Sequence, residues 1–89
     1  MTKTFIIGPA IAAALGLFAS TAAAAVMSGD YVGKTKAEIA ASLEQQGYEV
    51  RKVEDEDGNL EAYAVLDRQR FEIYVDPQTG NVVKIEHDD

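Results

Sequence analysis

The chain contains no cysteine, and its single histidine is His87. Without cysteine it forms no disulfide and offers no thiolate to a metal ion. Few residues could serve as a catalytic nucleophile, because Ser28 and Ser42 are the only serines after residue 24. A Ser–His pair would need hydrogen-bond contact in a rigid frame, and His87 lies three residues from the end, where we expect the chain to fray. We therefore expect no catalytic residues and no bound cofactor.

Positive charge is scarce as well, since 8 basic residues face 15 acidic ones and the net charge is −7. A phosphate backbone would be repelled by this charge, so we expect no nucleic-acid partner. Anionic membrane surfaces are disfavoured for the same reason. Most of the carboxylates fall at outward strand positions or in turns, which is typical of a solvated face and not of a shielded acid–base pair.

The N-terminus carries an apolar run that is too short to cross a membrane. It extends from Phe5 to Phe18, whereas a transmembrane helix needs roughly 20 apolar residues. Lys3 precedes the run, and the small residues after it form A-x-A sites that allow cleavage after Ala24 or Ala25. These features predict a cleaved signal peptide, and an uncleaved anchor is the alternative.

The predicted organisation is a signal peptide over residues 1–24, a lead-in segment over 25–33 and one domain over 34–89. An Ala-rich leader of this kind indicates a bacterial protein of the periplasm or the medium, without a stable membrane anchor after cleavage. A domain near 60 residues buries only about 60% of the surface that its unfolded chain exposes. A helix packed on a sheet must therefore supply the core.

A helix is predicted over residues 36–46. Thr35 and Glu38 fit a capping box, in which the Thr35 hydroxyl accepts an N–H and the Glu38 carboxylate reaches back to the Thr35 N–H. Gly47 follows where a helix C-terminus favours a left-handed residue. The apolar face of this helix consists of Ile39, Ala40 and Leu43.

Four alternating segments follow the helix and are predicted to be strands 48–54, 60–66, 71–75 and 82–86. Short turns join them, and Asp57-Gly58 is the strongest turn signal. The sequence thus predicts an α+β fold, with one N-terminal helix packed on a four-stranded antiparallel meander sheet. The inward register of the fourth strand stays open, because Val82 and Val83 compete for the inner face.

Alternation turns Tyr63, Val65 and Tyr74 away from the helix, onto a face that one-sided sheets usually leave polar. Adjacent aromatic residues on such a face can mark a partner surface, so these three are the candidate partner-binding residues. The alternative is that they only stabilise the sheet by cross-strand pairing.

Two acidic segments have residue types that metal ions bind. Asp55-x-Asp57-x-Asn59 resembles the start of a calcium loop, but Gly58 is at the fourth position, Leu60 occupies the sixth, where the EF-hand needs glycine, and Leu66 occupies the twelfth, where it needs glutamate. The tail Glu86-His87-Asp88-Asp89 carries one histidine and could at most bind a divalent ion weakly. We therefore expect no dedicated metal site.

Several of these segments together resemble the PepSY domain. They are Gly47-Tyr48-Glu49-Val50 after the helix, Asp57-Gly58, and the run from Glu72 to Val82 with its Asp-Pro-x-Thr-Gly turn. The resemblance covers Thr35 to Glu86 and implies a helix on an antiparallel sheet, similar to β-lactamase-inhibitor-like folds. It also implies a role in restraining peptidases outside the cytoplasm. One departure is the turn at 67–69, which lacks the glycine that the family leads us to expect.

The leading hypothesis is thus a non-enzymatic, exported, protein-binding module of PepSY type that modulates or inhibits an extracytoplasmic peptidase in trans. One alternative is a small envelope protein that binds a ligand or a metal. A purely structural or stress-related protein is a third.

The leader makes a prediction about processing. Because the apolar run ends in A-x-A sites, the protein isolated from its native host should begin at Ala25 or Val26. Mass spectrometry of the intact protein would measure this start. Recovery of Met1 in membrane fractions would instead favour the anchor.

Overall fold

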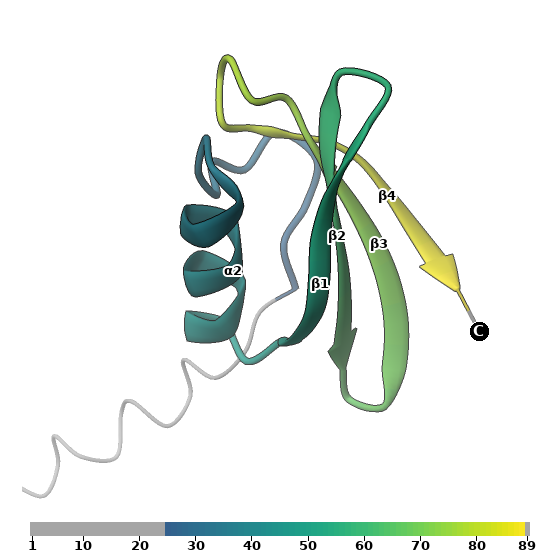
Figure 1. Ribbon diagram of the computed structural model, residues 1–89. Helices are drawn as coiled ribbons and strands as arrows, with labels where there is room; N and C mark the ends of the chain where they lie inside the picture. The colour runs from purple at the N-terminus through teal and green to yellow at the C-terminus, as the bar shows by residue number, and fades with distance from the viewer. Residues whose placement is uncertain (1–24, 89) are drawn as a thin grey trace, which may run out of the picture.

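The computed structural model describes residues 25–88, which form a four-stranded antiparallel sheet with one helix across one face (Figure 1). The strands lie in the order in which they follow along the chain, so the predicted α+β meander is confirmed. The helix lies mid-chain in the numbering and precedes all four strands. The elements are α2 (Lys36–Gln45), β1 (Glu49–Glu56), β2 (Asn59–Leu66), β3 (Gln69–Val75) and β4 (Val82–Asp88).

The predicted signal peptide lies outside the described residues. Among residues 25–88, no helix is long and apolar enough to cross a membrane.

Helix α2 begins at the predicted cap. Thr35 is extended, and its Oγ1 accepts the Glu38 N–H at 3.1 Å. The Glu38 carboxylate accepts the Lys34 N–H at 2.9 Å, and not the Thr35 N–H that the capping box predicts. Both hydrogen bonds of the cap are therefore present, but the carboxylate bonds the N–H one residue before the one expected.

The C-terminus of α2 is a Schellman motif built around Gly47, whose φ is 96°. The Tyr48 N–H donates to the Leu43 carbonyl at 3.0 Å, and the Gly47 N–H donates to the Glu44 carbonyl at 3.1 Å. Leu43 and Tyr48 are both buried in the same core, which is the hydrophobic contact that usually accompanies this motif. The motif reverses the chain directly into β1.

The core lies between α2 and the inner face of the sheet. Ile39 and Leu43 are completely buried, while Ala40, the third predicted member of the apolar helix face, is half-buried. Ala62 and Ala64 on β2 are small, so the helix can approach the sheet closely. The other buried members are Val26, Val32, Tyr48, Leu60, Ile73, Val75 and Val82.

The lead-in segment is part of this core and not a loose entry. Val26 and Val32 are buried, and the Val26 N–H donates to the Tyr48 hydroxyl at 3.1 Å. Hydrogen bonds also tie residues 29–33 to Gly80 and Val82. The sequence shows no periodicity here because the segment binds to distant residues and forms no regular element of its own.

The first two hairpins both have two-residue turns with positive φ at each central residue, as in type I′ turns. Asp57 and Gly58 have φ values of 50° and 86°, which confirms the predicted turn. Asp67 and Arg68 have φ values of 52° and 66°, although neither is glycine. A left-handed conformation costs a non-glycine residue about 1 kcal/mol. The fold therefore keeps the usual hairpin geometry without the expected glycine, at a cost in stability.

A bulge decides the register of β4. Val82 pairs with Val75 and is buried, whereas Lys84 pairs with Tyr74, so Val83 is the extra residue and is exposed. β4 also continues beyond the predicted end to Asp88. The expectation that His87 belongs to a frayed tail is therefore wrong. It pairs with Phe71, and the two rings stack with centroids 4.9 Å apart.

The N-cap can be tested directly. Thr35→Ala removes the hydroxyl that accepts the Glu38 N–H and should lower the free energy of unfolding by about 1 kcal/mol. In a domain of this size that lowers the melting temperature by several degrees. Thr35→Ser keeps the hydroxyl and should melt close to wild type. Equal melting of all three proteins would show that the cap hydrogen bond contributes nothing.

Candidate functional site on the outer face of the sheet

The outer face is the side of the sheet turned away from α2. Tyr63, Val65 and Tyr74 lie on it, as alternation predicts, and all three are half-buried. Tyr63 and Tyr74 are diagonal neighbours on β2 and β3, because Tyr63 pairs with Glu72 and Glu61 pairs with Tyr74. Diagonal neighbours are close enough for aromatic side chains to interact. The three predicted residues therefore share one surface.

A buried glutamate lies between the two tyrosines. Both β2 and β3 carry the sequence Glu-x-Tyr, and antiparallel pairing sets each glutamate opposite the tyrosine of the other strand. Glu61 is only 2% exposed although it faces away from the core. The expectation that the acidic residues form a solvated face is thus wrong for Glu61. The repeated Glu-x-Tyr pattern was the signal in the sequence that could have predicted this arrangement.

The outer face carries a carboxylate–tyrosine cluster in which two carboxyl groups compete for the protons of two phenols. Its members are Tyr63, Tyr74, Glu61 and Glu72. The Tyr74 hydroxyl lies 3.2 Å from Glu72 Oε1 and donates to it. Hydrogen bonding with Glu61, followed by burial, raises the pKa of Tyr74 above its usual range. Burial, followed by hydrogen bonding with Glu61, does the same to the pKa of Tyr63. Both phenols therefore keep their protons and act as donors to carboxylates.

Glu72 is a carboxyl of the cluster whose pKa is raised. A phenol has one proton to donate and cannot satisfy two carboxylates at once. A hydrogen bond shared with Glu61 and then burial raise the pKa of Glu72, against the lowering effect of the Tyr74 hydroxyl. A protonated Glu72 can donate to Glu61 and so relieve the repulsion between two neighbouring carboxylates.

Two lysines cover the outer sides of the tyrosine rings. Lys52 Nζ lies 4.7 Å from the Tyr63 ring centroid, and Lys84 Nζ lies 4.8 Å from that of Tyr74. Each lysine also pairs with a glutamate of its own strand, Lys52 with Glu54 at 3.7 Å and Lys84 with Glu86 at 3.1 Å. The tyrosines thus present ring edges within a charged border, as in a polar-rimmed contact surface.

Three carboxylates lie close enough together to contact one cation. Oxygens of Glu54, Glu56 and Glu61 lie within 4.8 Å of one another. Carboxylate oxygens suit Ca²⁺ or Mg²⁺, but calcium takes six to eight oxygens, so three glutamates would supply only part of a coordination shell. The expectation of no dedicated metal site and the alternative of a metal-binding protein both remain predictions.

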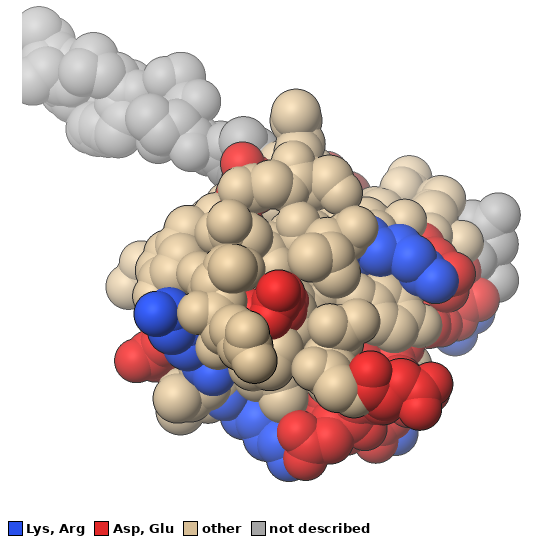
Figure 2. Space-filling model, turned by 90° about the horizontal axis from the view of Figure 1, so that it is seen from above, with Lys and Arg blue, Asp and Glu red and all other residues tan. Residues whose placement is uncertain are grey.

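Charge is divided between the two ends of the sheet. The β1–β2 end carries Glu54, Asp55, Glu56 and Asp57 in succession. Figure 2 looks onto the end of the molecule that bears this turn and shows acidic side chains gathered on one side of it. All three arginines of the chain line a hollow at the opposite end, near the β2–β3 turn.

A single helix across one face of a four-stranded antiparallel sheet, with a polar outer face bearing half-buried tyrosines, defines a small α+β module. Residues 9–86 match the family described as peptidase propeptide and YPEB domain. The match includes α2 and the first three strands and extends to Glu86 in β4, and the chain belongs to this PepSY family. No curated protein and no solved structure matches it.

The raised pKa of Glu72 predicts a pH-dependent stability. A carboxyl whose folded pKa is raised stabilises the fold fully below its unfolded pKa, and this contribution is lost as the pH rises through the folded value. Glu72→Gln mimics the protonated carboxyl. It should therefore raise the melting temperature at about pH 7 and leave it nearly unchanged at about pH 4.

Calorimetry at the two pH values measures the effect. Because the pKa shift of Glu72 arises first from Glu61, the gain at neutral pH should shrink when Glu61→Gln is also present. A gain of equal size at both pH values would contradict the role of the cluster.

Proposed function

We propose that this protein is a non-enzymatic, exported module that binds a peptidase outside the cytoplasm and restrains it in trans. The observation that carries the proposal is the match to the peptidase-propeptide family, which spans nearly the whole described fold. A propeptide acts on its enzyme by contact and not by chemistry, so the proposal needs a surface and not an active site.

The outer face supports such a surface. Tyr63, Val65 and Tyr74 combine apolar area with hydroxyl groups, and Lys52 and Lys84 border them. Tyrosine is enriched at protein interfaces because it offers a rigid ring and a polar tip together. The inner face is covered by α2, which leaves the outer face as the exposed side of the sheet.

The direct test uses the mature protein, beginning at Ala25, immobilised against a periplasmic extract and culture medium of its native host. A peptidase should be recovered, and titrating the free protein into that peptidase should lower hydrolysis of a peptide substrate to a plateau. Hydrolysis that stays unchanged, or that consumes the protein as a substrate, would overturn the proposal.

The tyrosines make a sharper prediction. Tyr63→Ser with Tyr74→Ser should weaken peptidase binding per folded molecule, because each aromatic anchor in a desolvated contact contributes about 2 kcal/mol or more. Cross-strand pairing contributes less to folding, roughly 0.2–1 kcal/mol for each pair, but the double variant also removes the phenols beside the buried Glu61 and should melt somewhat lower than wild type. Binding titration and thermal melting of the same samples separate the two effects.

Tyr31→Ser is the matched control, because Tyr31 is an exposed tyrosine on the lead-in segment. It should bind like wild type. If the double variant melts much lower while binding per folded molecule is unchanged, Tyr63 and Tyr74 are structural and the proposed surface is wrong.

The same preparation tests the ligand-binding alternative. A cation that binds only the folded state raises the melting temperature. A rise with added Ca²⁺ that Glu61→Gln abolishes, together with no recovered peptidase, would favour the alternative over the present proposal.

A further inference from the structure

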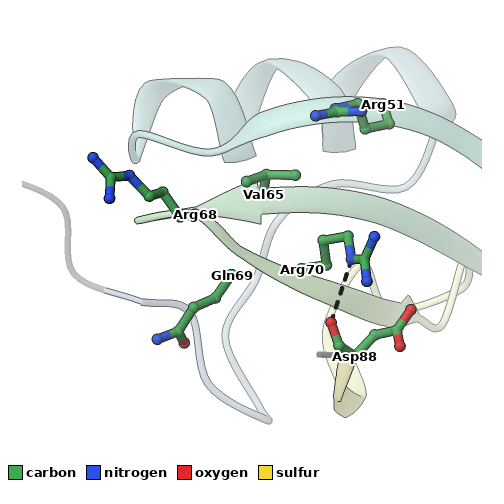
Figure 3. A pocket seen from close by; sticks show the side chains of 6 residues that line it. All are labelled: Arg51, Val65, Arg68, Gln69, Arg70 and Asp88. Carbon is green, nitrogen blue, oxygen red and sulfur yellow. Dashed lines mark hydrogen bonds between the residues drawn. The ribbon is translucent and has the colours of Figure 1, made fainter.

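The arginine pocket is an open hollow of about 520 Å³ on the outer face, near the β2–β3 turn (Figure 3). Arg51, Arg68 and Arg70 line it and are the only arginines of a chain whose net charge is −7. Val65, Gln69 and Asp88 complete the lining, and Glu49 beside Arg51 adds a second carboxylate, so positive charge exceeds negative charge here. A concentration of positive charge against the overall charge of the protein needs an explanation.

Two of the three arginines reach the pocket through irregular backbone. Arg70 occupies a regular outward position, paired with Val65 on one side and Asp88 on the other. Arg51 is the extra residue of the bulge in β1, where the register shifts between Val50 and Lys52. A bulge re-aims a side chain, and here it directs a second guanidinium toward the same hollow.

Arg68 reaches the pocket from the β2–β3 turn, where its φ is 66°. Glycine would adopt this conformation without strain, and the family resemblance leads us to expect glycine here. The chain instead holds an arginine in a strained conformation at the rim of the pocket, and Figure 3 shows its side chain extending away from those of Arg51 and Arg70. Strained residues of this kind concentrate at functional sites, where their side chain is needed.

The guanidinium groups retain donors for a ligand. Arg51 Nε lies 3.4 Å from Glu49 Oε2, and both side chains are exposed. Arg70 Nε donates to the Asp88 backbone carbonyl at 3.5 Å. Within residues 25–88 the Arg68 side chain makes neither a hydrogen bond nor an ion pair. Each guanidinium carries five N–H donors in a planar fork, so most of them stay available to an oxyanion.

An apolar patch adjoins these donors. Figure 3 shows Val65 on the strand between those that carry Arg51 and Arg70. A smaller hollow shares these three residues, and Tyr63, Glu72 and Asp88 also line it. The combined site therefore suits a carboxylate carried by a chain that also presents an apolar side chain.

We infer that the arginine pocket binds the carboxylates of an acidic segment of the protein partner. The inference rests on the proposed function for the source of that segment. An extended membrane surface is a poor occupant, because its negative charge would also meet the acidic β1–β2 end of the same sheet. A short segment can contact the pocket and the neighbouring Val65 without reaching that end.

The test titrates a capped tetraglutamate peptide into the ¹⁵N-labelled mature protein at low ionic strength. The Nε–H signals of Arg51, Arg68 and Arg70 and the amide of Val65 should shift to saturation. Arg68→Gln with Arg70→Gln should weaken binding about tenfold or more, as expected when charge-assisted hydrogen bonds are lost. Lys34→Gln with Lys36→Gln removes the same charge elsewhere and should have a much smaller effect.

Arg68→Gly separates function from folding. Glycine relieves the left-handed strain, so this variant should melt at or above the temperature of wild type and yet bind the peptide more weakly. Binding unchanged in Arg68→Gly, absence of saturable shifts, or equal weakening in the lysine variant would each overturn the inference.

Two further probes test the occupant. Inorganic phosphate or phosphatidylglycerol vesicles that shift the same signals at lower concentration than the peptide would overturn the assignment to an acidic protein segment.

The outcome for the pocket can be separated from the outcome for the proposed function. If the wild-type protein binds tetraglutamate at the pocket but recovers no peptidase, the inference about the pocket stands and the proposed function is overturned. If the arginine variant and wild type recover a peptidase equally well, the inference about the pocket is overturned and the proposed function stands.

Discussion

Burial of one face of the sheet beneath α2 is the contact on which the rest of this protein depends. With no disulfide, Ile39 and Leu43 must anchor the helix on β1 and β2, and both are completely buried. The small side chains of Ala62 and Ala64 leave room for this approach. Once this face is covered, alternation sends every second strand residue to the outer face.

The outer face then has to accommodate both charge and aromatic side chains. Its centre holds Glu61, a buried carboxylate that lies beside the protonated phenols of Tyr63 and Tyr74 and beside Glu72, whose pKa is raised. On either side of this centre the charge separates, with acidic residues at the β1–β2 end and the arginine pocket at the other end. An outer face with an ordered centre and two oppositely charged ends has the features of a recognition surface, which is consistent with membership of a propeptide family.

Much of the fold followed from local patterns in the sequence. The helix ends one residue before its predicted end, and Asp57-Gly58 forms the predicted turn. The first strand begins one residue later and ends two residues later than predicted, and the other three strands are one or two residues longer than predicted. Capping residues, turn residues and hydrophobic period are properties of neighbouring residues, so they can be read without knowing the tertiary structure. The lead-in segment was missed because Val26 and Val32 pack against residues far along the chain.

The sequence by itself determined the element order, the inner and outer faces, and the placement of Tyr63, Val65 and Tyr74 together on one side. Strand periodicity is sufficient for that, because it fixes the direction of each side chain relative to its own strand. Only the tertiary structure decided that Glu61 is buried, that Val83 is exposed at a bulge, and that all three arginines line one hollow. These outcomes depend on cross-strand register, on two bulges and on a strained turn, which set positions between strands, and the repeated Glu-x-Tyr pattern hints only at the first of them.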